Sequence, residues 1–293
     1  MNLKAVLRGT GVAIITPFNE NKEVDFDALE KLIDFNINNG VNYIVTLGTT
    51  GETPVLSSTE KKDIIKFTID KINGKVPVVV GMGGNDTQSL VKEIETASLE
   101  KATAILSASP YYNKPSQQGI YQHYKVIAKA SPLPVILYNV PGRTGRNMTS
   151  ETTLKLAHEV ENIAGIKEAS GDMIQCMEIL RDKPDDFLVV SGDDMLALPQ
   201  LACGMDGVIS VVANCYPKEF SNLVKNALDG NLLEAKKIND FLLPAYNYLF
   251  SENNPAGVKA FLYEMKLIKN ELRLPGVAVE NQLQEKIKKF VSS

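Results

Sequence analysis

Eight short runs of apolar, mostly β-branched residues recur along this chain at intervals of roughly 20 to 33 residues, separated by segments with the apolar period of a helix. Near-continuous apolar strands that alternate with helices predict a parallel sheet covered on both faces. About eight such units close into a (β/α)8 TIM barrel. The runs are Val12–Ile15, Tyr43–Leu47, Val76–Val80, Ala104–Ser107, Pro134–Tyr138, Ile163–Ile166, Phe187–Val190 and Val208–Val212.

An open, doubly wound sheet is the competing architecture for the same pattern. It is expected to carry a G-x-G-x-x-G phosphate loop after its first strand, and nothing of that form follows Gly11. Polar residues instead follow most of the apolar runs, and in a barrel all strand ends of one kind share a single mouth. The barrel is therefore preferred. These residues are Thr16-Pro17, Thr49-Thr50, Tyr111-Tyr112, Tyr138-Asn139, Lys167, Ser191–Asp193 and Asn214.

The last part of the chain shows helical patterns without further strand signals. Asn231–Phe250, Pro255–Ile268 and Val279–Val291 each have helical periodicity. No low-complexity linker precedes them. We therefore predict a catalytic barrel over residues 1–228 and a C-terminal helical appendage over residues 229–293 that packs on it.

Charge and composition exclude several classes of function. The chain has 31 Lys and Arg against 35 Asp and Glu, for a net charge of −4. No basic cluster that would bind a phosphate backbone is present, so neither nucleic acid nor an anionic membrane is an expected partner. Cys176, Cys203 and Cys215 have no CxxC spacing, which indicates neither a disulfide framework nor a zinc site. With no leader pattern and no membrane span, a cytoplasmic location is expected.

Lys167 lies at the C-terminal end of the apolar run Ile163–Ile166. A buried ammonium is costly, so such a lysine either pairs with a charge or releases its proton. A neutral lysine amine is a nucleophile that forms Schiff bases with carbonyl substrates. The competing interpretation is a strand-end lysine whose ammonium simply reaches water.

Other polar groups at the same mouth raise the weight of the catalytic interpretation. Tyr138 offers a phenol as a proton relay, and Thr50 can polarise it. Thr49, Thr50 and Gly51 present consecutive N–H groups that could hold a carboxylate, and Arg143 could clamp a second carboxylate. Each has a structural alternative: a core tyrosine, a simple turn and a solvated arginine. The two histidines and the acidic residues show no ligand spacing, and imine chemistry needs no cofactor.

Four motifs occur in order along the chain: Gly48–Glu52, Ser109–Pro115, Tyr138–Thr144 and Gly165–Glu168. Together they resemble the signatures of the dihydrodipicolinate synthase family of pyruvate-dependent class I aldolases. The resemblance runs in register from about Gly11 to Val211 and continues more loosely to Pro275. The family also implies a homotetramer, built as a dimer of tight dimers.

The resemblance implies a role for each candidate residue. Lys167 forms the Schiff base with pyruvate, and Tyr138 shuttles protons. Thr50 links Tyr138 to Tyr112, which reaches in from the neighbouring subunit across the tight dimer. The remaining roles are binding ones: Thr49 and Thr50 hold the pyruvate carboxylate, the backbone carbonyl of Ile209 lines the site, and Arg143 receives the carboxylate of L-aspartate 4-semialdehyde. The implied product is 4-hydroxy-tetrahydrodipicolinate, a precursor of diaminopimelate and lysine.

The chain departs from the family at the pocket where lysine-sensitive members bind their inhibitor. Asn85 and Tyr111 match that pocket, but its histidines and its glutamate are missing. A cationic ligand would meet Lys61, which is repulsive. We therefore expect weak or absent feedback by lysine. The other positions that correspond are Thr53, Pro54, Ser58 and Ser89.

Two further functions remain open from the sequence. A sugar-acid aldolase of the N-acetylneuraminate lyase or keto-deoxy-gluconate aldolase type would share the lysine, the tyrosine and the threonine-rich loop. The Gly142–Thr144 run and the paired Tyr111-Tyr112 favour the synthase, since an acidic aldehyde needs a cation at the mouth. A non-catalytic, ligand-binding paralogue would usually lack part of the constellation, and here every member is present.

Overall fold

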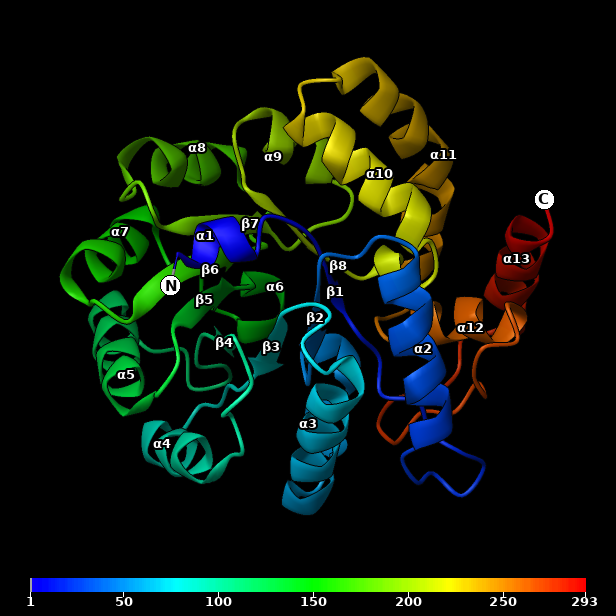
Figure 1. Cartoon of the computed structure of the whole chain (residues 1–293), viewed down its shortest axis with the longest axis horizontal. Coiled ribbons are helices and arrows are strands. Elements are labelled where there is room, and N and C mark those ends of the chain that lie inside the picture. The colour runs from blue at the N-terminus through cyan, green and yellow to red at the C-terminus, as the bar shows by residue number, and fades with distance from the viewer. Residues whose placement is uncertain (1) are drawn as a thin grey trace.

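A computed structural model describes residues 2–293 and shows a closed barrel of eight parallel strands in sequential order (Figure 1). The predicted (β/α)8 fold is confirmed. The strands are β1 Gly9–Ala13, β2 Tyr43–Thr46, β3 Val78–Gly81, β4 Ala104–Ala108, β5 Val135–Asn139, β6 Ile163–Glu168, β7 Leu188–Ser191 and β8 Gly207–Ser210.

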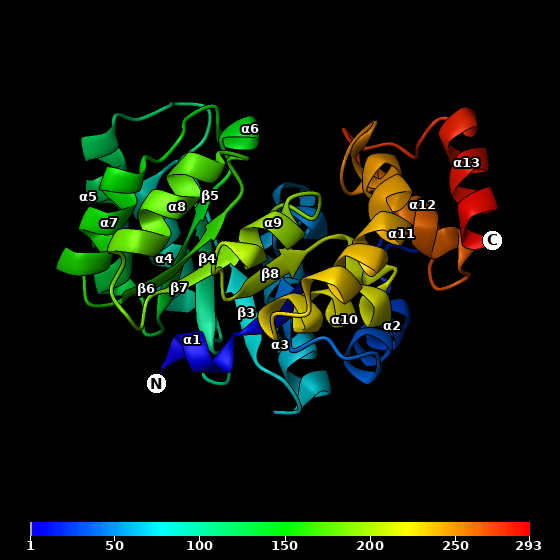
Figure 2. The ribbon, with the colours of Figure 1, turned by 90° about the horizontal axis from the view of Figure 1, so that it is seen from above.

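Helices surround the barrel and close one of its ends. The N-terminal α1 (Leu3–Val6) and the short α6 lie at opposite ends of the strands in Figure 2, so α1 closes the bottom and α6 belongs to the C-terminal mouth. The surrounding helices are α2 Phe26–Asn38, α3 Ser58–Ile72, α4 Thr87–Thr96, α5 Gln117–Ala130, α6 Pro141–Thr144, α7 Ser150–Glu159, α8 Met173–Asp182, α9 Ala197–Ala202 and α10 Pro217–Leu228. Three 3-10 turns are η1 Thr49–Gly51, η2 Thr53–Val55 and η3 Val212–Asn214.

Three C-terminal helices of the described chain pack beside the barrel. They are α11 Leu232–Phe250, α12 Ala256–Glu264 and α13 Asn281–Val291. Figure 2 shows α12 and α13 on the same side as α6. No helix among the described residues is long and apolar enough to cross a membrane.

Helices begin at capping residues and prolines that the sequence already shows. At the start of α3, the Ser57 hydroxyl accepts from the N–H of Glu60 while the Glu60 carboxylate accepts from the N–H of Ser57. This capping box satisfies two otherwise unpaired donors. Pro217 occupies the first turn of α10, where a missing N–H costs nothing.

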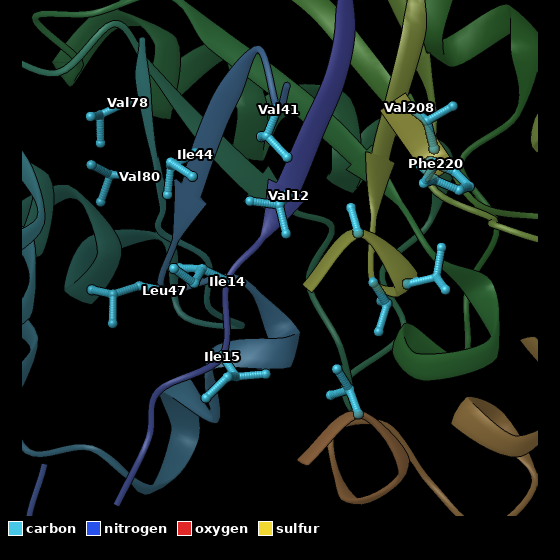
Figure 3. Close-up of a cluster of buried hydrophobic side chains, with 14 of the residues drawn as sticks. Val12, Ile14, Ile15, Val41, Ile44, Leu47, Val78, Val80, Val208 and Phe220 are labelled. Atoms are coloured by element: carbon cyan, nitrogen blue, oxygen red, sulfur yellow. The ribbon is translucent and has the colours of Figure 1, made fainter. Parts of the chain in front are cut away.

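The apolar residues of the strands divide into two cores. One fills the barrel and includes Tyr43, Val79, Ile136 and Val190. The other lies between the strands and the helices, and Figure 3 shows the side chains of its members, such as Ile44 and Val80, on the outer face of the sheet. Alternating residues of each strand therefore enter different cores, which is why the strands appear continuously apolar.

All eight strands differ from their predicted bounds by one or more residues at one end or both, and for three of them the structure gives the cause. β1 begins at Gly9 and ends at Ala13 because its two glycines belong to the strand: a Cβ on Gly11 would lie 2.2 Å from the Tyr43 ring. β3 begins after Pro77, which has no N–H for the ladder. β8 ends at Ser210 because the N–H groups of the next two residues donate to the Asp194 carboxylate instead.

Replacing Gly11 by Ala should destabilise the protein by about 1–3 kcal/mol, because the added methyl group overlaps a rigid ring inside a packed barrel. The comparison is Gly84→Ala, where an added Cβ would meet no atom within 4 Å. Urea unfolding measures both free energies. Equal stabilities would contradict this account of the barrel interior.

Stability should also fall in mild acid through His123 on α5. This ring is buried, its Nδ1 bonds Thr87 Oγ1 at 2.8 Å, and burial lowers its pKa to about 4. Because the unfolded histidine has a pKa near 6.5, only the unfolded state gains the proton as pH falls from about 7 to 5, which costs about 2 kcal/mol. The unfolding free energy of His123→Gln should vary less over this range. An identical pH slope in both proteins would refute this.

Candidate active site

Lys167 lies inside the barrel, close to its C-terminal mouth. It is only 5% exposed, and the β5–β6 register places it directly beside Tyr138. The Lys167 Nζ lies 4.3 Å from the centroid of the Tyr138 ring. Gly192, just after β7, makes room for this side chain, since a Cβ there would lie 2.7 Å from Lys167 Cε. The predicted pairing of lysine and tyrosine is therefore present.

The Lys167 amine has no carboxylate partner. Across residues 2–293, no acidic oxygen lies within 4.0 Å of its Nζ. The adjacent Glu168 belongs to the other face of the strand, where it accepts from Asn139 Nδ2 at 3.0 Å, Gln175 Nε2 at 3.0 Å and the Ser170 N–H at 2.6 Å. The Glu168 carboxylate is thus hydrogen-bonded outside the barrel. Within the described chain, no acidic side chain competes with a ligand for the Lys167 amine.

The threonine-rich loop forms the turn η1 above β2. The Gly51 N–H donates to the Gly48 carbonyl at 2.9 Å, so it is used within the turn. In the described chain, the N–H groups of Thr49 and Thr50 have no backbone acceptor and remain available to a carboxylate. The predicted anion nest therefore has two donors instead of three.

Thr50 is 2% exposed and its hydroxyl accepts from Asn254 Nδ2 at 3.0 Å. Since a hydroxyl has one proton to give, this bond leaves the Thr50 O–H free to donate to a second group. Asn254 comes from the segment before α12, and its carbonyl also accepts from Arg143 Nη2 at 3.1 Å. One residue thus ties the loop to the arginine.

Arg143 is on α6, and Ile209 is buried in β8 among the residues that fill the barrel. Arg143 shares with Tyr138 and Thr49 a cavity of about 290 Å³ at the mouth. Within the described chain the wall of this cavity has two cationic side chains and no carboxylate. The wall consists of Leu47, Gly48, Thr49, Thr53, Pro54, Lys61, Gly81, Met82, Gly83, Leu106, Ala108, Tyr111, Tyr138, Val140 and Arg143.

Tyr112 does not join the other candidates within one chain. It is 88% exposed, has a left-handed backbone with φ of +69°, and makes no hydrogen bond to Thr50 or Tyr138 among the described residues. An exposed aromatic side chain in a loop beside the mouth is free to meet a second subunit.

Three features around the candidate residues were not assigned a role from the sequence. Asn254 appeared only as part of a loose similarity, Gly192 only as one of several strand-end residues, and the buried pair of Glu52 and Lys259 was missed. The acidic pattern gave no metal site, and the described residues hold no cluster of three or more His, Cys, Asp or Glu side chains that could bind one.

A barrel whose mouth holds a buried, unpaired lysine beside a tyrosine belongs to the class I aldolase type of enzyme, in which the amine condenses with a carbonyl. Residues 6–293 match the model of the dihydrodipicolinate synthetase family. The chain belongs to that family.

Relatives cover almost the whole chain. The 4-hydroxy-tetrahydrodipicolinate synthase of Parabacteroides distasonis is 50% identical over 285 residues, which are 97% of this chain and 96% of the relative. The crystal structure of dihydrodipicolinate synthase from Thermotoga maritima is 40% identical with a TM-score of 0.95, covering 98% of both chains. The chloride-inhibited enzyme from Acinetobacter baumannii, complexed with pyruvate, is 41% identical with a TM-score of 0.94 and the same coverage.

Proposed function

We propose that this protein condenses pyruvate with L-aspartate 4-semialdehyde to give 4-hydroxy-tetrahydrodipicolinate, a step toward diaminopimelate and lysine in the cytoplasm. The observation that carries the proposal is the Lys167 amine, unpaired within the described chain and held beside the Tyr138 ring in the barrel of a dihydrodipicolinate synthetase family member. Family membership and the cationic cavity favour this reaction over a sugar-acid aldolase or a non-catalytic paralogue.

In the first half-reaction, Lys167 Nζ attacks the pyruvate ketone and water leaves, which forms a cationic imine. The imine draws electrons from the methyl group, so that loss of one methyl proton gives an enamine. The free N–H groups of Thr49 and Thr50 hold the pyruvate carboxylate, and the carbonyl of Ile209 lines the site. No external cofactor is required.

In the second half-reaction, the enamine carbon attacks the aldehyde, and Tyr138 protonates the resulting alkoxide. The amino group of the second substrate then attacks the imine carbon and displaces Lys167, which closes the ring and frees the enzyme. Arg143 receives the carboxylate of the aldehyde substrate. Its bond to the Asn254 carbonyl fixes the arginine at the cavity wall.

Protons pass between Tyr138 and Tyr112 of a neighbouring subunit through the hydroxyl of Thr50. The free O–H of Thr50 and the exposure of Tyr112 in the single chain support this relay. The assembly that supplies it is a homotetramer made of two tight dimers.

Lys167→Ala should lose essentially all turnover and keep its fold, because the removed amine makes no ion pair within the described chain. Treating the wild type with pyruvate and borohydride should add one reduced pyruvyl group at Lys167, detected by intact mass and peptide mapping. The control is Lys71→Ala, which removes a surface lysine paired with Glu30 and Asp34. Failure to form an adduct in the wild type would reject the mechanism.

Lysine feedback should be weak or absent. A second cavity of about 410 Å³ has Lys61, Lys62 and Lys92 on its wall, and its one carboxylate, Glu93, pairs with Lys61 at 3.3 Å. The structure thus adds a carboxylate that the sequence analysis did not place there, but it is engaged and the wall stays positive. The ammonium of free lysine is repelled there.

Initial rates at saturating substrates should therefore change little when lysine is added at millimolar concentration. Exchanging Lys61 for His should increase the sensitivity, because it removes a fixed cation from the wall. A rate halved by millimolar lysine in the wild type would refute the expectation.

A further inference from the structure

A buried ion pair joins the threonine-rich loop to the C-terminal helices. Glu52, which follows η1 directly, pairs with Lys259 of α12. Lys259 is 0% exposed and Glu52 is 7% exposed. Figure 2 shows α12 on the side of the barrel where α6 marks the mouth. Two charges that are distant in sequence are thus withdrawn from water next to the site.

Further contacts of the two side chains come from the C-terminal segment and from Phe18, in the loop after β1. Lys259 Nζ donates to the Glu271 carbonyl at 2.8 Å and lies 4.2 Å from the centroid of the Phe18 ring. The second oxygen of Glu52 accepts from the Arg273 N–H at 3.2 Å. Arg273 covers the same Phe18 ring at 4.5 Å. Glu52 is therefore held from two directions.

The loop that Glu52 ends is strained. Leu47 and Glu52, on either side of Thr49–Gly51, both adopt left-handed backbone conformations with φ of +55°. Such conformations cost residues with a Cβ about 1–2 kcal/mol each and persist only where the surroundings enforce them. The ion pair anchors the side chain of the residue at the second of the two positions.

Stability alone does not explain a buried pair at this place. Withdrawing two charges from water costs about as much as their attraction returns, and apolar replacements of similar volume are often neutral. Burial is the dominant influence on Lys259 and lowers its pKa to about 8, even though Glu52 acts to raise it. The benefit of the pair must therefore lie in the conformation that it fixes.

We propose that Glu52 and Lys259 are positioning residues that hold Thr49–Gly51 in the conformation that binds the keto-acid carboxylate. Neither side chain lines the cavity at the mouth, so the effect passes through the backbone of the loop. This assignment gives the C-terminal helices a part in substrate binding. The identity of the substrate rests on the proposed function, whereas the geometry of the loop does not.

The test compares the wild type with Glu52→Gln/Lys259→Met, in which two neutral side chains of similar size replace the pair. This double variant should fold with nearly unchanged thermal stability. Hydrogen exchange of the peptide covering residues 47–56 should become faster. The KM for pyruvate should rise about tenfold or more, while kcat should fall less than about threefold, because ground-state binding is lost and the chemical groups remain.

Glu52→Gln alone should show the same KM change with an added loss of stability, since it leaves a buried ammonium unpaired. Lys71→Met, near the C-terminal end of α3, removes a lysine that pairs with Glu30 and Asp34; it is the control and should change neither the exchange of residues 47–56 nor the pyruvate KM. Unchanged exchange of residues 47–56 in the folded double variant overturns the proposal, as does an unchanged pyruvate KM. A wild type that forms no pyruvate adduct rejects the proposed function instead, and the exchange result still decides the positioning role.

Discussion

The chemistry proposed for this protein depends on one amine enclosed in the barrel. Lys167 lies at the level of the mouth where an ammonium would be poorly solvated, and no acidic side chain in the described chain neutralises it. The strand register makes this arrangement possible, because Lys167 and Tyr138 are direct neighbours on β6 and β5 and both side chains face the interior. Closure of the sheet then brings the ends of the other strands around them.

The groups around the Lys167 amine differ in charge between the mouth of the barrel and its outer face. At the mouth of the barrel lie groups that attract anions: the free N–H groups of Thr49 and Thr50, and the guanidinium of Arg143 on α6. Outside the barrel, the adjacent Glu168 is satisfied by neutral donors. In the proposed reaction, the groups at the mouth favour the carboxylate of a keto acid, while its carbonyl reaches the lysine.

Much of this could be predicted from the sequence, because barrel strands are local and periodic. The eight runs and the capping box of α3 follow from patterns within single units, and the placement of Lys167 beside Tyr138 follows from the sequential order of two neighbouring units. The start of β1 could not be predicted, since Gly9 and Gly11 look like turn residues until Tyr43 is seen to fill the space where a Cβ would be.

Contacts between segments far apart in the chain could not be predicted from the sequence either. Asn254 bonds Thr50 across 204 positions, and Lys259 pairs with Glu52 only because α12 folds back toward the mouth. Nothing in the local composition of either segment signals its partner. The same holds for Tyr112, whose proposed role requires a second subunit and which is exposed in the single chain.

The most direct measurement is a crystal structure of the protein soaked with pyruvate. The account predicts continuous electron density from Lys167 Nζ to the ketone carbon, with the carboxylate on the N–H groups of Thr49 and Thr50 and the Tyr138 hydroxyl next to the imine. Pyruvate bound elsewhere, or bound at this mouth without a covalent link to Lys167, would contradict it.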